Sequence, residues 1–388
     1  MKVTVVLSVF QAWREGYFSR LQIRHPVKLT VIHGSGVTGT KLRNAPATPN
    51  VHRVQLTQWT LATKITGRPA HVYLFKGLLR QFRKTSPDVV LLEGGSNLLN
   101  NFFVLLWCWM RRIPVVWWTL GEIPGRKYSI VGRIFRKLVA FLELRCDAML
   151  LYSSVALAYA KRIGVPDEKC FVATNVVDTE KCAERAIKLR GNRHQLRNEL
   201  FGDDHPIVVF VGALAEGKYL DRLPNIFSIV ISKIPKARLL IIGDGPLMSS
   251  LKQEIAERNL SDSTFFAGDQ RDQLSKYLVA GDVFLLPGLG GLAISEAMAH
   301  GLPVVCAQGD GTEVDLVING ETGCRLETNS KDDINVLLAN SVVDLLADAD
   351  LRKMYSENSI ALVTQKFTGT NMVNQIFNAL EHAHNQRK

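Results

Sequence analysis

Two successive series of short β-branched runs, each alternating with amphipathic segments, constrain the fold of this chain more than any other feature. Alternation of this kind builds parallel sheets that are covered by helices on both faces. The sequence therefore predicts an α/β protein with two doubly wound, Rossmann-like domains facing each other across a cleft. The expected strands are Lys2–Leu7, Lys28–His33, Asp88–Leu92, Pro114–Thr119, Ala148–Tyr152 and Cys170–Thr174, then Ile207–Val211, Ala237–Ile242, Thr264–Ala267, Val283–Leu286 and Pro303–Cys306. Helices are expected between them, for example at Leu98–Met110, Lys127–Leu144, Leu220–Ile234, Leu247–Asn259 and Leu292–His300.

The boundary between the two domains is expected within Val176–Pro206, which combines a strongly charged helical segment with a Gly-Asp-Asp-His-Pro turn. We place the domains at residues 1–190 and 191–388, with a final helix that can pack back on the first domain. The chain has 388 residues, enough for two domains of ordinary size. Its hydrophobic fraction of 47% and charged fraction of 21% are typical of folded proteins and exclude intrinsic disorder.

Charge is distributed unevenly between the two halves. Residues 1–205 contain 31 lysines and arginines against 14 aspartates and glutamates, whereas residues 206–388 contain 16 against 22. The basic half is expected either to meet an anionic partner, such as a lipid surface, a lipid-linked phosphate or nucleic acid, or simply to carry solubilising charge. No nucleic-acid recognition motif accompanies the charge, so nucleic acid is not expected as a partner.

Cysteine spacing and hydropathy indicate the compartment. The six cysteines form no Cys-x-x-Cys pair and are expected to be reduced thiols. The first ten residues, MKVTVVLSVF, are typical of a strand and lack a signal-peptide cleavage site. The longest apolar stretch, Phe102–Met110, is too short to span a bilayer. A cytoplasmic protein, with or without peripheral attachment to the inner face of the cytoplasmic membrane, is therefore expected.

Several strand-to-helix loops of the second series have the composition of phosphate-binding loops. Gly212 follows a strand, and Lys218 lies within the same loop. Such a glycine lets the backbone approach a ligand, and the lysine can neutralise a phosphate, although an ordinary surface lysine is the simpler interpretation. Gly243 and Gly245 follow the next strand, before Pro246, and are compatible with a plain strand–helix turn as well.

The most informative segment joins the strand Val283–Leu286 to a glycine-rich turn and the helix that follows it. Free backbone N–H groups and the positive end of the helix dipole suit a diphosphate there. Glu296, one turn inside that helix, can accept hydrogen bonds from two ribose hydroxyls or merely stabilise the helix start. A later loop, Gly309–Glu313, again combines glycines with a carboxylate.

The same segment satisfies the dinucleotide fingerprint Gly-x-Gly-x-x-Ala at Gly288, Gly290 and Ala293, with Glu313 twenty residues further on. This makes an NAD-type oxidoreductase a rival interpretation. It is disfavoured because the pattern follows a late strand of its domain and Pro287 precedes the first glycine. Asp348-Ala349-Asp350 has the form of a metal-binding Asp-x-Asp, but its position between two helices favours helix capping.

The order and spacing of these motifs resemble the donor domain of family-4 retaining glycosyltransferases with the GT-B fold (glycosyl transferases group 1). The matching segments within residues 207–327 are Phe-Val-Gly…Lys, Ile-Ile-Gly-Asp-Gly-Pro, Phe-x-Gly, the strand ending in Leu-Leu-Pro, Ser-Glu-Ala-Met-Ala-His-Gly-Leu-Pro-Val-Val and Gly-Glu-Thr-Gly. In addition, the segment that begins at Asn175 and ends at Asp178 resembles the family's Asn-x-x-Asp near the domain junction.

The resemblance implies a nucleotide-sugar donor linked to UDP or GDP, bound by the second domain, and an acceptor bound by the first. It implies that Lys218 contacts the donor diphosphate and that Glu296 binds the ribose; these two are the candidate catalytic residues. Backbone groups or side chains of the other donor-binding candidates line the same site: Gly212, Gly243, Gly245, Gly290, Gly291, Leu292, Ala293 and Glu313. Metal-independent, cofactor-free transfer with retention to a glycan or lipid-linked acceptor, in surface polysaccharide synthesis, is what the resemblance implies.

The chain departs from the family pattern at three places. Ala213 replaces an arginine, Gly288 replaces the first of two paired glutamates, and no histidine follows the strand Pro114–Thr119. Glu122 lies near the end of that strand and can take the histidine's place on the acceptor side. A nucleotide-sugar-binding relative without catalytic activity is therefore an alternative.

The segment Lys127–Leu144 is expected to be an amphipathic helix. Its apolar face is expected to pack on the sheet; the residues of that face are Ile130, Ile134, Leu138, Phe141 and Leu142. Arg133, Arg136 and Lys137 are expected on the opposite face, in water or close to an anionic membrane.

Overall fold

The computed structural model describes residues 1–36, 44–46, 48–63, 70–95, 97–123, 125–126, 128–271, 273–327 and 333–387. The chain separates into two compact units. Unit 1 comprises Met1–Thr174 and Thr370–Lys388, and unit 2 comprises Asn175–Gly369. The division therefore falls sixteen residues before the expected end of the first domain at residue 190.

Helices α6 (Thr179–Arg190) and α7 (Arg193–Phe201) form the charged segment that was expected at the boundary, and both pack within unit 2. Asp282 fixes α7 there, because its carboxylate accepts hydrogen bonds from Arg193 at 2.6 Å and from Arg197 at 2.5 Å, both in this helix. Arg197 and Asp282 are both buried, and such a pair is stable only when its hydrogen bonds are satisfied.

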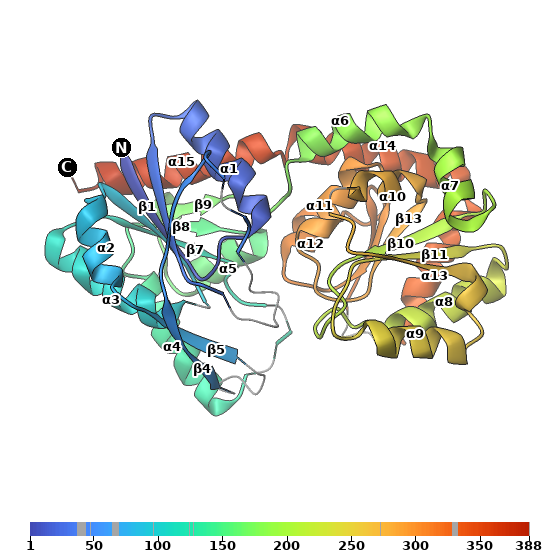
Figure 1. Ribbon diagram of the computed structural model, residues 1–388, viewed down its shortest axis with the longest axis horizontal. Helices are drawn as coiled ribbons and strands as arrows, with labels where there is room; N and C mark the ends of the chain where they lie inside the picture. The colour runs from blue at the N-terminus through green and yellow to red at the C-terminus, as the bar shows by residue number, and fades with distance from the viewer. Residues whose placement is uncertain are drawn as a thin grey trace. The chain divides into compact units, whose positions relative to one another are not determined.

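A seven-stranded parallel sheet forms the centre of unit 1, in the order β3-β2-β1-β6-β7-β8-β9 (Figure 1). Its strands are β1 (Lys2–Leu7), β2 (Lys28–His33), β3 (His52–Gln55), β6 (Val89–Glu93), β7 (Val115–Thr119), β8 (Ala148–Leu151) and β9 (Cys170–Val172). A separate antiparallel pair consists of β4 (Gln58–Thr63) and β5 (Ala70–Phe75). Six of these strands match expected ones; β3, β4 and β5 have no counterpart in the sequence prediction.

The helices of unit 1 cover both faces of this sheet. They are α1 (Ala12–Arg24), α2 (Leu78–Thr85), α3 (Leu98–Arg111), α4 (Ile130–Glu143), α5 (Ser154–Arg162) and the C-terminal α15 (Gly369–Asn385), with a 3₁₀ turn at Asp167–Lys169. The two tryptophans of β7 lie on opposite faces of the sheet, because successive side chains of a strand point in opposite directions. Trp117 lies in the core shared with α2–α5, and Trp118 contacts Phe18 of α1 edge-on.

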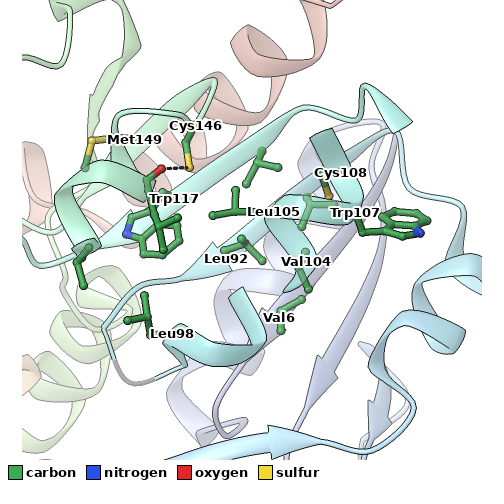
Figure 2. Close-up of a cluster of buried hydrophobic side chains, with 14 of the residues drawn as sticks. Val6, Leu92, Leu98, Val104, Leu105, Trp107, Cys108, Trp117, Cys146 and Met149 are labelled. Atoms are coloured by element: carbon green, nitrogen blue, oxygen red, sulfur yellow. Dashed lines mark hydrogen bonds between the residues drawn. The ribbon is translucent and has the colours of Figure 1, made fainter. Parts of the chain in front are cut away.

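The core on the α2–α5 side is continuous from β1 to β8. Figure 2 shows Val104, Leu105 and Cys108 of α3 beside Val6 and Leu92 of the sheet. All of these side chains are buried, as is expected of strands covered on both faces.

The C-terminal helix α15 returns to unit 1 after the chain has completed unit 2. The ring of Phe377 stacks on His25 at 4.0 Å between centroids, and Arg387 donates a hydrogen bond to Asp147 at 2.8 Å. These contacts tie the last helix to α1 and to the segment that precedes β8.

Unit 2 contains a six-stranded parallel sheet in the order β12-β11-β10-β13-β14-β15 (Figure 1). The strands are β10 (Ile207–Val211), β11 (Arg238–Ile242), β12 (Thr264–Gly268), β13 (Val283–Leu286), β14 (Val304–Ala307) and β15 (Gly323–Leu326). Besides α6 and α7, its helices are α8 (Arg222–Lys233), α9 (Met248–Glu257), α10 (Leu274–Ala280), α11 (Leu292–Ala299), α12 (Thr312–Leu316), α13 (Ile334–Ala347) and α14 (Ala349–Gln365), with a 3₁₀ turn at Ser261–Ser263. The predicted α/β class is confirmed.

Asp348 caps helix α14: its carboxylate accepts hydrogen bonds from the backbone N–H groups of Asp350 and Leu351. The capping interpretation of Asp348-Ala349-Asp350 is thereby confirmed.

The expected orientation of α4 is wrong. Of the five apolar residues assigned to its inner face, only Leu142 is buried. Ile130, Ile134, Leu138 and Phe141 are 48–69% exposed. The helix packs instead through Gly132, Val139, Leu142 and Glu143. Only this narrow side of α4 is covered, and the helix has more apolar residues than lie on that side. Lys127, the expected first residue, lies outside the described residues.

All six cysteines are free thiols. In the part of the chain that the structure describes, no helix is both long enough and apolar enough to cross a bilayer.

Candidate functional site

The carboxyl edge of the unit 2 sheet brings the sequence-predicted donor loops together. β10 is flanked by β11 on one side and by β13 on the other, so the chain order reverses between β10 and β13. Ligands of doubly wound proteins bind beyond the carboxyl ends of the strands at such a switch point. The loops that follow β10 and β13 contain Lys218 and the glycine-rich turn, respectively.

Gly243 and Gly245 allow the loops after β10 and β11 to pack backbone against backbone. Gly243 has φ +136°, and a Cβ atom there would lie 1.9 Å from the carbonyl oxygen of Gly212. A Cβ on Gly245 would lie 2.3 Å from the carbonyl oxygen of Leu214. These glycines are therefore required by the loop packing itself. A cavity of about 180 Å³ opens beside Gly243, lined also by Asp269 and Arg271 beyond β12.

Lys218 joins the loop after β10 to the loop after β13. Its Nζ donates hydrogen bonds to the carbonyl oxygens of Leu289, at 2.5 Å, and Gly290, at 3.0 Å. The ammonium group is half-buried and is held beside the turn that opens α11.

Gly290 and Gly291 shape the start of α11. Gly291 is the N-cap residue and has φ +72°, a conformation that favours glycine. A Cβ on Gly290 would lie 2.9 Å from side-chain atoms of both Ile294 and Leu286. The N–H groups at the start of a helix have no acceptor within the helix, so the amides around Leu292 and Ala293 are available to an anion.

Glu296 lies one turn inside α11 and is half-buried. Burial raises the pKa of its carboxyl to about 7, against the opposing effect of Arg185 from α6. No donor to this carboxylate is found among the described residues. One turn further on, the Nδ1–H of His300 donates to the backbone oxygen of Glu296 at 2.7 Å. Burial lowers the pKa of His300 to about 4, so its ring is neutral near pH 7.

The carboxylate of Glu313 forms hydrogen bonds within its own loop. Its carboxylate accepts hydrogen bonds from the N–H groups of Gly309 and Gly311, each at 2.8 Å, and the residue is buried. Burial raises its pKa, although these backbone bonds oppose the shift. In the dinucleotide-binding interpretation this carboxylate would hold a ribose; its engagement with the loop disfavours that role.

Two residues near the site were missed by the sequence analysis. The carboxylate of Asp310 lies 3.9 Å from where a Cβ on Gly291 would be. Arg222, the first residue of α8, donates to the carbonyl oxygen of Pro287 at 3.1 Å, and its guanidinium lies 4.4 Å from the ring centroid of Tyr219. Asp310 lies in the loop after β14, between Gly309 and Gly311, and Arg222 directly follows the loop after β10. Their positions shortly after strand ends were the available indication.

Position 288 has no room for the paired glutamate of the family pattern. A Cβ on Gly288 would lie 2.6 Å from the backbone carbonyl of Lys218 and from the ring of Tyr219. Tyr219 itself has φ +49°, which is unusual for a residue other than glycine. The loop after β10 therefore occupies the space that a longer side chain at position 288 would need.

The remaining candidates belong to unit 1. Glu122 forms an ion pair with Arg162 of α5. Arg133 and Lys137 are exposed on α4. Arg136, by contrast, is half-buried, and its guanidinium lies 4.8 Å from the ring centroid of Tyr159. The structure thus separates Arg136 from the two basic residues with which it was grouped.

No group of three or more His, Cys, Asp or Glu side chains placed to hold a metal ion occurs within the described residues.

Two doubly wound units with parallel sheets define the GT-B fold. A solved structure of Anabaena HepE in complex with UDP and glucose superposes on 98% of this chain and 99% of its own, with a TM-score of 0.73 and 16% sequence identity. Residues 192–361, all of which lie within unit 2, match the family model of glycosyl transferases group 1. The family resemblance drawn from the motifs is confirmed.

Curated relatives align with part of the chain. The sulfoquinovosyl transferase SQD2 of Arabidopsis thaliana is 34% identical over 252 residues, which are 63% of this chain and 47% of SQD2. The capsular polysaccharide biosynthesis glycosyltransferase CapM of Staphylococcus aureus is 28% identical over 209 residues, 51% of this chain and 50% of CapM. The chain thus spans about half the length of these relatives.

Proposed function

We propose that the protein is a glycosyltransferase that moves a sugar from a UDP- or GDP-linked donor to a glycan or lipid-linked acceptor. The observation that carries this proposal is the position of Lys218, whose ammonium group is held against the loop that opens α11. A fixed cation beside an uncapped helix start suits a diphosphate, which carries its negative charge on adjacent groups.

The roles of the donor-site residues follow from their positions. Lys218 and the backbone amides of Gly290–Ala293 bind the diphosphate. Glu296, one turn deeper, accepts the ribose hydroxyls, since a half-buried carboxylate that receives no donor from the described residues gains hydrogen bonds from them. The cavity beside Gly243 takes the nucleobase. HepE was crystallised with UDP and glucose, which supports UDP as the first nucleotide to test.

The transfer itself is proposed to proceed with retention and without a metal ion or cofactor. As the glycosidic bond to the donor diphosphate breaks, the departing phosphate oxygen takes the proton of the acceptor hydroxyl. Lys218 and the start of α11 stabilise the charge that develops on that phosphate. Glu122 is proposed on the acceptor side. The name of CapM, a capsular polysaccharide biosynthesis glycosyltransferase, supports an acceptor in surface polysaccharide synthesis. We further propose that the reaction takes place at the inner face of the cytoplasmic membrane.

A second candidate is a nucleotide-sugar-binding protein without turnover. It is favoured by Gly288, where the backbone of Lys218 and the ring of Tyr219 exclude the family's glutamate. Release of UDP or GDP in the presence of acceptor distinguishes the two candidates, because only the transferase liberates the nucleotide.

Nucleotide binding is the first expected result. UDP or GDP should raise the melting temperature, whereas NAD should not. A ligand at one hundred times its Kd stabilises a protein by about 2.7 kcal/mol, enough for a clear shift. Differential scanning fluorimetry with UDP, GDP, their sugars and NAD(P) measures this. Stabilisation by NAD alone would refute the proposed donor.

The affinity for the nucleoside diphosphate should depend on the ionisation of Glu296. The pKa of this carboxyl is about 7 in the free protein, and only the carboxylate accepts two ribose hydroxyls. Affinity should therefore rise as pH increases from about 6 to about 8, by up to about tenfold per pH unit on the acidic side of the pKa.

Isothermal titration of the wild type and Glu296→Gln over this range provides the test. The nucleotide's own phosphate titrates identically in both proteins, so the difference between the two pH profiles reports Glu296. His300 stays neutral throughout, because its pKa is about 4. Parallel profiles would show that Glu296 does not hold the ribose.

A further inference from the structure

Helices α3 and α4 of unit 1 expose an unusual amount of apolar surface. Twelve of the twenty large hydrophobic side chains that are exposed among the described residues lie on these helices or directly after them. We call them the α3–α4 surface: Leu99, Phe102, Phe103, Leu106, Trp109, Met110, Ile130, Val131, Ile134, Leu138, Phe141 and Leu144. Soluble proteins rarely leave a contiguous apolar area of this size in water, so the surface indicates a binding partner.

The twelve side chains form two helical stripes. On α3 they recur at intervals of three and four residues from Leu99 to Met110. Val104, Leu105 and Cys108, on the other side of this helix, are buried (Figure 2). On α4 they recur from Ile130 to Phe141, whereas Val139 and Leu142 of this helix are buried. The inner sides of both helices belong to one hydrophobic core, so both outer stripes lie on the same side of the sheet.

Arg145 connects the two stripes. Its guanidinium lies 3.3 Å from the ring centroid of Phe141 and 5.9 Å from that of Trp109. The C-terminal ends of α3 and α4 are therefore adjacent, and their aromatic side chains share one arginine. The stripes form one continuous surface there.

The exposed charged side chains on α3 and α4, and directly after them, are all basic. The side chains of Arg111, Arg112, Arg133, Lys137 and Arg145 are exposed. α3 contains no acidic residue, and the single acid of α4, Glu143, is buried and accepts a hydrogen bond from Tyr159 at 2.6 Å. An apolar area with a purely basic surround matches the interface of an anionic phospholipid bilayer.

We propose that the α3–α4 surface docks on an anionic phospholipid bilayer, inserting its apolar side chains at the level of the headgroups. A second copy of the chain fits less well, because a two-fold interface would bring the basic residues of both copies together. The proposal is independent of the proposed donor site, which lies in unit 2.

Insertion makes the binding partly resistant to salt, whereas attraction by the basic residues alone is screened within a Debye length. Wild-type protein should float with vesicles of phosphatidylcholine and phosphatidylglycerol, weakly with phosphatidylcholine alone, and should retain part of its binding at high salt.

The test compares two variants with matched chemistry. The triple variant Met110→Ser/Ile130→Ser/Ile134→Ser removes three side chains of 64–69% exposure from the surface. The control variant Ile23→Ser/Ile187→Ser removes side chains of 80% and 70% exposure elsewhere. The triple variant should lose at least about tenfold in vesicle partitioning and all salt-resistant binding, and the control should lose neither.

Equal partitioning of wild type and triple variant would overturn the proposal, as would wild-type binding that vanishes completely at high salt. A concentration-dependent dimer of the wild type that the triple variant abolishes would assign the surface to a second copy instead. Thermal shifts with UDP and GDP, measured on every variant, report folding and the donor site separately.

Discussion

Replacing Lys218 by methionine should lower kcat/KM by roughly 30- to 1000-fold, which corresponds to about 2–4 kcal/mol of transition-state stabilisation. Methionine keeps most of the apolar stem and removes the charge. With Ala213 in the position of the usual arginine, we expect Lys218 to be the main fixed cation for the diphosphate. The substitution also removes both hydrogen bonds that join the loops after β10 and β13.

Binding measurements separate these effects. Lys218→Met should weaken binding of the nucleoside diphosphate strongly and binding of the free nucleoside little, because the nucleoside has no phosphate. Glu296→Gln should weaken binding of the nucleoside diphosphate and of the nucleoside, since both ligands contain the ribose. Lys252→Met on α9, an exposed lysine whose Nζ lies near the ring of Phe266, is the matched control and should leave both unchanged. Equal losses for nucleoside and nucleoside diphosphate in Lys218→Met would contradict a diphosphate contact.

The central strands of both sheets could be predicted from the sequence. Lys2–Leu7, Lys28–His33, Ile207–Val211 and Val283–Leu286 are found with the expected bounds. Each of these strands pairs on both sides and contains consecutive buried apolar residues, as in a sheet that is covered on both faces. The position of the glycine-rich loops at the carboxyl edge of the second sheet followed from the same pattern.

Two of the four edge strands, β3 and β15, and the antiparallel pair were not predicted in this way. β3 (His-Arg-Val-Gln) and β15 (Gly-Cys-Arg-Leu) pair on one side only, and β4 pairs with β5 outside the main sheet. A strand with one exposed edge needs fewer apolar residues, so its sequence carries little period-two alternation. The orientation of α4 was not predictable for a different reason. A helical wheel shows which residues share a face, but it does not show how much of that face the sheet covers.

Within the site, residue types were predictable from the sequence, whereas their partners depend on loop conformation. The engagement of Glu313 with Gly309 and Gly311 closes a five-residue loop that the sequence does not determine. The exclusion of a side chain at position 288 arises from the backbone of Lys218, seventy residues earlier. Contacts of this kind depend on where two loops meet, and periodicity contains no information about that.

The second large effect is expected for Gly243→Ala. The new Cβ would lie 1.9 Å from the carbonyl oxygen of Gly212, and no side-chain rotation relieves a clash with backbone. In addition, φ is +136°, which costs a residue other than glycine about 1–3 kcal/mol. The loops after β10 and β11 must separate, so both the melting temperature and the affinity for UDP or GDP should fall, the affinity by at least about tenfold.

Two alanine controls divide this effect into its causes. At Gly164, φ is +93° and no atom lies within 4 Å of a new Cβ, so Gly164→Ala carries backbone strain without a clash. At Gly191, φ is −62° and the space is likewise open, so Gly191→Ala should be neutral or stabilise by up to about 1 kcal/mol. Denaturant unfolding should give the lowest free energy of unfolding for Gly243→Ala, a higher value for Gly164→Ala and the highest for Gly191→Ala. Only Gly243→Ala should lose affinity for the nucleotide. A Gly243→Ala protein that binds UDP or GDP like Gly164→Ala would mean that the close packing of these two loops is not what forms the donor site.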